Sequence, residues 1–175
     1  MPPVGHPFRY TVIAHAPRRI LGPIADERLD ALVERLPLGR GDHALEIGSG
    51  KGELLVRLLA RWPEATAEGF DRTPWFNAAA RAAAEAAGVA DRLSILETDA
   101  PGPLVADRSV ALTIAMGATG ILGDAAQTVA GLAAATRPGG IVVYGDGIWI
   151  REPLAEGMNA FGMTRDELPE GPEGL

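Results

Sequence analysis

Cysteine is absent from the sequence, and histidine is scarce. Without cysteine the chain forms neither a disulfide framework nor a thiolate metal site. The three histidines, His6, His15 and His43, show no helical ligand spacing, so no metal site is predicted. Long hydrophobic runs are also lacking, since the longest uncharged run, 110–123, is well short of the ~20 residues that a membrane helix needs. Because the start of the chain has no continuous apolar segment of signal-peptide type, we expect a cytoplasmic protein without a membrane partner.

Positive charge is in short supply as well. Sixteen lysine and arginine residues stand against 23 aspartate and glutamate residues, which gives a net charge of -7. The molecule therefore repels polyanions, and we expect no nucleic-acid partner. Arg9, Arg18, Arg19 and Arg28 form either a local basic patch or a solvated face, and the sequence alone leaves both open. The 47% of hydrophobic and 22% of charged residues are typical of a globular protein.

Short apolar runs alternate with helical patterns along the middle of the chain. The runs are 44–47, 67–70, 93–96, 110–116 and 141–144. Alternating strands and helices indicate a parallel sheet that is covered by helices on both faces. We therefore predict an α/β fold, a Rossmann-like three-layer αβα sandwich with a mostly parallel sheet.

Capping signals and apolar spacing delimit the helices. Asp26 is a plausible N-cap for a helix whose buried face holds Leu29, Leu32, Val33 and Leu36. The next helix is indicated by Leu54, Leu55, Leu58 and Leu59, and another by Thr73 as cap, Pro74 as first residue and Gly88 as stop. A capping box of Asp124 and Gln127 starts the last one, in which Val129 and Leu132 should face inward before 137–140 turns the chain.

We expect the 175 residues to form one domain with three parts. Residues 1–24 are an irregular arm, rich in proline and glycine, that lies over another part of the molecule. Residues 25–150 are the core, and 151–175 are a polar tail. That tail is either disordered or belongs to a chain that stops short of its natural end.

A glycine-rich turn, Gly48-Ser49-Gly50-Lys51-Gly52, follows the first apolar run. A phosphate-binding P-loop needs glycine where Leu45 stands and a hydroxyl residue in place of Gly52. The dinucleotide fingerprint needs glycine where Glu53 stands. The observed pattern is instead E-x-G-x-G-x-G, from Glu46 to Gly52.

Carboxylates end or follow the first three predicted strands. Glu46, Asp71 and Asp99 should converge at the carboxyl edge of the sheet, where open parallel sheets bind ligands. Two charges about 4 Å apart interact by about 4 kcal/mol at an effective dielectric of ~20, so this edge disfavours a pyrophosphate. It favours a ligand that is positively charged and rich in donors, and S-adenosylmethionine is such a ligand.

From Ala44 to Ile148 the chain resembles the class I, Rossmann-like S-adenosylmethionine-dependent methyltransferases. The resemblance is carried by LEIGSGKGELL, EGFDRTPWFNAAARAAA, LETDAPGPL and RPGGIVVYGDGIW. The sheet of that family normally continues past its fifth strand with a helix and an antiparallel strand pair. This chain has no such pattern after Trp149. If the chain is complete, its fifth strand is expected to be an edge that the tail or a homodimer partner covers, and if it is a fragment, cofactor binding and activity are expected to be weakened.

The resemblance implies a role for each matching residue. Gly48, Ser49, Gly50 and Gly52 correspond to the turn under the methionine part of S-adenosylmethionine, with Glu46 supporting that loop or the ammonium group. Asp71 corresponds to the carboxylate on the ribose hydroxyls, with Arg72 near the adenine. Asp99 and Ala100 correspond to the adenine-binding pair, and Met116 lies near the transferred methyl group.

Methyl transfer needs alignment of the nucleophile and exclusion of water, and a base only if the acceptor carries a proton of high pKa. Asp146 and His15 are weak candidates for that base. The chain has AMGATGIL where DNA amino methyltransferases often carry [DN]-P-P-[YFW], so we expect a small-molecule acceptor. Two alternatives stay open: an S-adenosylmethionine-binding or regulatory protein without catalysis, and an NAD(P)-dependent oxidoreductase in which Asp71 holds the ribose.

Overall fold

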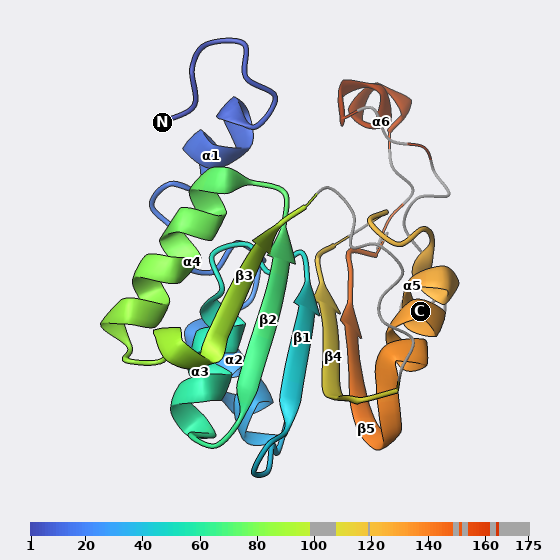
Figure 1. Cartoon of the computed structure of the whole chain (residues 1–175). Helices are drawn as coiled ribbons and strands as arrows, with labels where there is room; N and C mark the ends of the chain where they lie inside the picture. Colours follow the sequence, from blue (N-terminus) through green and yellow to red (C-terminus); the bar gives the residue numbers. More distant parts are fainter. Residues whose placement is uncertain (99–107, 119, 149–150, 152–153, 162–163, 165–175) are drawn as a thin grey trace.

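The computed structural model describes residues 1–98, 108–118, 120–148, 151, 154–161 and 164 (Figure 1). Its centre is one five-stranded sheet with the order β3-β2-β1-β4-β5. The strands are β1 (His43–Ile47), β2 (Thr66–Asp71), β3 (Leu93–Glu97), β4 (Val110–Met116) and β5 (Thr136–Gly145). Every pairing between these strands is parallel, which confirms the predicted α/β class.

Helices lie on both faces of the sheet (Figure 1). The face-covering helices are α2 (Asp26–Glu34), α3 (Glu53–Arg61), α4 (Pro74–Ala86) and α5 (Ala125–Ala135), with a 3-10 turn at Ala90–Arg92. Two short helices, α1 (Arg9–His15) and α6 (Ala155–Phe161), lie beyond the carboxyl ends of the strands (Figure 1). One core joins α2, α3 and α4 to the sheet, and a second core joins α5 to the opposite face. The result is the predicted three-layer sandwich.

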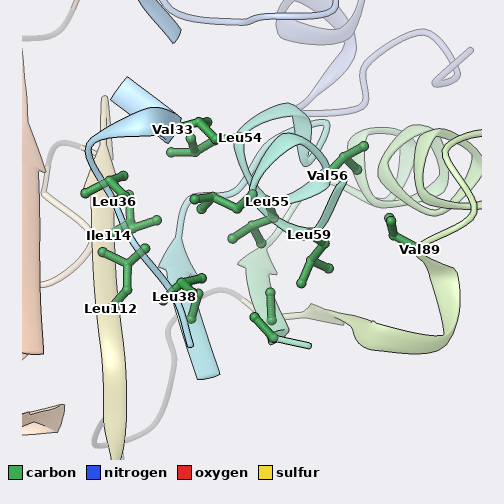
Figure 2. Packing of buried hydrophobic residues seen from close by; sticks show 14 of the residues in the cluster. Val33, Leu36, Leu38, Leu54, Leu55, Val56, Leu59, Val89, Leu112 and Ile114 are labelled. Carbon is green, nitrogen blue, oxygen red and sulfur yellow. The ribbon is translucent and has the colours of Figure 1, made fainter. Parts of the chain in front are cut away.

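Side-chain alternation along β1 supplies both cores. Ala44 belongs to the core under α3, whereas Leu45 and Ile47 belong to the core under α5. In the first core the leucines of α3 are buried as predicted, and Leu55 is completely inaccessible. Figure 2 shows side chains from α2, α3 and β4 converging in that core. The burial of this apolar surface fixes the glycine-rich turn between β1 and α3.

Two of the predicted helix starts are confirmed. Thr73 is the N-cap residue of α4 and Pro74 is its first residue. Asp124 and Gln127 form both bonds of a capping box at α5, with N···O distances of 2.8 and 2.9 Å. These bonds satisfy N–H groups that a helix start leaves without a partner.

Two side chains lie elsewhere than predicted. Ala25, not Asp26, is the N-cap residue of α2, and the Asp26 carboxylate pairs with Arg19 and Arg57 instead. Val129 is 40% exposed, whereas Leu132 is completely buried. Helical spacing placed both on one face, but α5 turns Val129 away from the sheet.

The predicted turn at 137–140 is part of β5. Val110 pairs with Thr136 and Leu112 pairs with Ile141, so one residue of β4 lies opposite four residues of β5. Gly139 has a φ of +77°, which explains the turn signal in the sequence. The segment is therefore an irregular insertion within a strand.

The arm and the tail each contain a helix. The arm was predicted to be irregular, but it includes α1, and the tail includes α6. No helix in the described part of the chain is both long and apolar enough to cross a membrane. Nor do the described residues bring together three acidic, histidine or cysteine side chains in a group that could hold a metal ion.

Candidate functional site

The predicted site residues meet at the carboxyl edge of the sheet, between β1 and β4. The chain order reverses at this point, since β2 and β3 lie on one side of β1 while β4 and β5 lie on the other. Such a reversal leaves a crevice at the strand ends. Glu46 in β1, Asp71 at the end of β2 and Met116 at the end of β4 all lie at this edge. Asp99 and Ala100 fall outside the described residues.

The glycine-rich turn requires glycine for two reasons. Gly48, Gly50 and Gly52 have φ values of +70°, +55° and +70°, a region that side chains disfavour. Space is also lacking, since a Cβ atom at Gly48 would lie 2.9 Å from the Ala118 Cβ atom. At Gly52 the same atom would lie 2.9 Å from the Ala80 Cβ atom. The turn is therefore fitted closely to its surroundings.

Asp71 ties this turn to the start of α4. One carboxylate oxygen accepts a hydrogen bond from the Gly50 N–H at 2.9 Å, and the other accepts one from the Thr73 N–H at 2.7 Å. An ionised carboxylate offers about four acceptor positions, so two of them are left for a ligand. Asp71 thus has a structural role that the sequence did not reveal, while its role on the ribose hydroxyls stays a prediction.

Glu46 is a buried carboxyl group, only 5% exposed. Its Oε2 atom has no hydrogen-bond partner among the described residues. Burial, together with the negative charge of Asp71, raises the pKa of Glu46 to about 8. A positively charged ligand group would supply the missing partner and stabilise the ionised form.

Two adjoining cavities open at this edge, with volumes of about 380 and 430 Å³. Both values fall within the range of about 300–1,000 Å³ that is usual for ligand pockets. The first cavity is lined by Glu46, Ser49 and Asp146, and the second by His15, Asp71 and Arg72. The wall that they share is made by Gly48, Gly50, Met116, Gly117 and the arm segment 21–23.

Buried polar atoms without a partner collect around the cavities. In the described part of the chain these atoms are His15 Nδ1, Glu46 Oε2, Ser49 Oγ, Trp62 Nε1 and Asn77 Oδ1. The first three belong to residues that line a cavity. Leaving a buried polar group without a hydrogen bond costs about 1–3 kcal/mol, so such groups are rare unless a ligand or water completes them.

The two candidate bases line different cavities. Asp146 lines the first cavity, where its carboxylate accepts hydrogen bonds from the Tyr144 hydroxyl at 3.0 Å and the Gly147 N–H at 2.7 Å. Burial and the bond to Asp146 raise the pKa of Tyr144 to about 12, so that its hydroxyl stays protonated. His15 lines the second cavity beside Asp71.

Sequence reasoning missed three residues of the site. Lys51 donates hydrogen bonds from Nζ to carbonyl groups of the arm. Leu21 packs against Gly50, and a Cβ atom added at Gly50 would lie 2.7 Å from the Leu21 Cδ1 atom. Tyr144 orients Asp146. The expectation that the arm lies over another part of the molecule was the one pointer toward Leu21. No pattern in the sequence predicted the contacts that Lys51 and Tyr144 make.

Comparison with known proteins identifies the family. Residues 44–140 match the family model described as a methyltransferase domain. The chain belongs to the methyltransferase family. It is 34% identical over 148 residues to protein YjhP of Escherichia coli K12. The matched region covers 85% of this chain and 59% of YjhP. The resemblance of its motifs to methyltransferases is thereby confirmed.

Solved methyltransferase structures have the same fold. A S-adenosylmethionine-dependent methyltransferase from Geobacter sulfurreducens, in complex with S-adenosylhomocysteine, superposes with a TM-score of 0.82 at 32% identity, over 94% of this chain and 66% of that one. A second such complex, from Thiobacillus denitrificans, gives a TM-score of 0.80 at 32% identity, over 94% and 66% of the two chains. The structure of Escherichia coli YjhP gives 0.80 at 31% identity, over 95% and 68%. This methyltransferase chain therefore spans between 59% and 68% of the length of these relatives.

Proposed function

We propose that this methyltransferase chain binds S-adenosylmethionine across the two cavities and transfers its methyl group to a small-molecule acceptor. The observation that carries this proposal is the set of unpartnered polar atoms, His15 Nδ1, Glu46 Oε2 and Ser49 Oγ, around cavities that meet at the sheet's point of reversal. A ligand with an ammonium group, a sulfonium group and a ribose diol complements these groups.

The first cavity suits the methionine part of S-adenosylmethionine. Glu46 would face the ammonium group, which favours an ionised carboxylate. Ser49 offers a hydroxyl group, and the glycine turn lets the backbone come close to the ligand. Met116 and Gly117 line the wall between the cavities, which is where the methyl group would lie.

The second cavity suits the adenosine part. Asp71 keeps acceptor positions for ribose hydroxyls, and Arg72 lines the same cavity. Asp99 and Ala100 are proposed to contact the adenine, on the strength of the motif that they share with the family. The S-adenosylhomocysteine that the Geobacter and Thiobacillus proteins hold supports the same ligand class for this chain.

The chain's own groups would align the acceptor. S-adenosylmethionine supplies an electrophilic methyl group that a nucleophile takes by in-line displacement. Asp146 lines the first cavity and is the better candidate to accept a proton from the acceptor, while Tyr144 orients its carboxylate. Apolar side chains line the same cavity, among them Ile20, Leu29 and Leu54. A small acceptor with an apolar body and a hydroxyl or amine group fits this lining.

Calorimetric titration tests the proposal. We expect S-adenosylmethionine and S-adenosylhomocysteine to bind with micromolar dissociation constants, and Asp71→Asn to weaken both by roughly tenfold or more, since a hydrogen bond to a charged group contributes about 1.5–3 kcal/mol. NADH and NADPH are the control ligands, and Glu68→Gln in β2 is the control variant.

Three outcomes distinguish the alternatives. Binding of NADPH without binding of S-adenosylmethionine would support the oxidoreductase instead. Binding of S-adenosylmethionine without turnover on a broad acceptor panel would support a regulatory protein. If turnover is found, Asp146→Asn should lower it while the affinity for S-adenosylhomocysteine stays unchanged.

A further inference from the structure

The arm brings a histidine to the second cavity. His15 is the last residue of α1, and its ring meets the Phe76 ring edge-on, with centroids 6.3 Å apart and planes at 79°. Its Nδ1 atom is buried and has no hydrogen-bond partner among the described residues. Phe76 contributes only an apolar surface, so packing alone leaves this nitrogen unsatisfied.

We propose that His15 recognises a ribose hydroxyl of the ligand in the second cavity, and that Lys51 is the positioning residue that holds His15 there. The inference rests on the proposed function, because it needs an adenosyl ligand in that cavity. It changes the part assigned to His15 from a candidate base to a group that binds the cofactor.

The chemistry of the cavity favours a neutral diol at this place. Asp71 offers only acceptors, whereas a neutral imidazole offers one acceptor and one donor. Burial, with the positive charges of Arg18 and Lys51, lowers the pKa of His15 and keeps its ring neutral. The two hydroxyl groups of a ribose can therefore bond to Asp71 and to His15 together.

Lys51 fixes the end of α1 to the glycine turn. Its Nζ atom donates hydrogen bonds to the carbonyl oxygens of His15, Ala16 and Arg18 at 2.8, 3.2 and 2.6 Å. The last carbonyl groups of a helix lack partners within it, and a cation at that end is favourable. Since α1 has only seven residues, it is too short to be stable without such contacts.

Lys51 therefore couples two parts of the proposed ligand site. It lies between Gly50 and Gly52, in the turn proposed to carry the methionine part. By bonding to the backbone carbonyl of His15, it also fixes the position of the residue that carries the imidazole ring. Its three ammonium donors match three acceptors, so Lys51 acts on the ligand through His15 rather than directly.

The test compares S-adenosylhomocysteine with its 2′-deoxy and 3′-deoxy analogues by calorimetry. The wild-type protein should lose roughly 5- to 30-fold in affinity when the hydroxyl that His15 contacts is missing. His15→Ala should bind S-adenosylhomocysteine weaker by a similar factor and should no longer distinguish that analogue. His15→Gln, which keeps a donor and an acceptor, should restore part of the difference.

His43→Ala is the matched control, because His43 starts β1 and bonds to Thr66 at 2.9 Å, at the far end of the strands. It should bind all three ligands like the wild type. Circular dichroism and thermal melting of each variant show whether the fold is kept. If His15→Ala keeps both the affinity and the discrimination of the wild type, the inference is overturned while the proposed function stands. If the wild type binds no S-adenosylhomocysteine, both fail.

Lys51 is tested by a double-mutant cycle. Lys51→Met should weaken binding and reduce the same hydroxyl discrimination, and Lys51→Arg should recover part of both. In the His15→Ala background, Lys51→Met should have little further effect, because it acts through His15. An equal loss in both backgrounds would refute the positioning role.

Discussion

At the scale of single residues, comparing Gly52 of the glycine turn with Gly88 distinguishes the effect of backbone strain from that of steric crowding. Gly52 has a φ of +70°, and a Cβ atom there would press on the Ala80 Cβ atom at 2.9 Å. Gly88 has a similar φ of +68°, but a Cβ atom there would meet nothing within 4 Å. The pair therefore differs in crowding alone.

We predict that Gly52→Ala lowers the free energy of unfolding by about 2–4 kcal/mol, from strain and overpacking together. Gly88→Ala should lower it by only about 1–2 kcal/mol, from strain. Urea unfolding of both variants and of the wild type measures these changes in the free energy of unfolding. Equal losses would mean that α4 shifts away from the turn without cost.

Glu46 makes stability depend on pH. Its pKa of about 8 in the folded protein lies above the usual value of 4.5. Between these two pH values the folded protein holds a proton that the unfolded chain has released. Through this group, the free energy of unfolding therefore falls as the pH rises from about 4.5 to about 8, by at most about 1.4 kcal/mol per pH unit.

We predict that Glu46→Gln flattens this slope, because an amide does not titrate, and that it stabilises the protein most at pH 8. Urea unfolding between pH 5 and pH 8 is the measurement. Glu68→Gln, at a position paired with Leu45 of β1, is the control and should keep the slope. A slope that is the same in both variants would mean that Glu46 is ionised in the folded protein.

Residue types and spacing were sufficient to place Glu46 and Asp71 at the carboxyl edge of the sheet, but they did not predict the contacts of Lys51. The first two stand where strands end, which an apolar run reveals locally. Lys51 meets carbonyl groups that lie 33–36 residues earlier in the chain. Backbone acceptors leave no trace in side-chain identity, so no sequence pattern reports them.

At the scale of elements, an arginine joins α2 to α3. Arg57 is 15% exposed and contacts Asp26, Asp30 at 2.6 Å and Glu53 at 2.7 Å. Three carboxylates around one guanidinium would repel one another without it. Both α2 and α3 contribute to the core beneath the glycine turn. The contacts of Arg57 therefore stabilise the packing on which this turn rests.

We predict that Arg57→Met lowers the free energy of unfolding by about 1–3 kcal/mol, as expected for hydrogen bonds to charged groups. Arg40→Met is the control, because Arg40 is 87% exposed and pairs with Glu64 at 3.6 Å. Its loss should be about 0–1 kcal/mol. Denaturant unfolding of both variants is the measurement. Losses of the same size would show that the three carboxylate partners of Arg57 contribute no more to stability than a single exposed ion pair.

Elements with strong periodicity were predicted well, and those determined by distant contacts were not. Each of the five predicted strands lies within an observed one, because buried parallel strands read as apolar runs. The helix α1 was missed, since it is held by Lys51 and by the ring contact of His15 with Phe76 of α4 rather than by its own pattern. The turn-like glycines of 137–140 concealed an insertion within β5.

At the scale of the whole molecule, the layers followed from the sequence but the strand order did not. Alternating strands and helices require a covered parallel sheet, whatever the order of its strands. The reversal between β1 and β4, where the cavities open, is known from the structure. The arm's position across the two cavities became known only from the structure, because no periodic pattern links residues 21–23 to the turn.

Lys51 is the single lysine of the sequence. Its amine is engaged by three carbonyl groups of the arm. Amine-reactive reagents should therefore modify this lysine slowly while the arm is seated, and quickly once the arm is displaced. Because one side chain carries the whole signal, the rate of lysine acylation reports the position of the arm on the glycine turn.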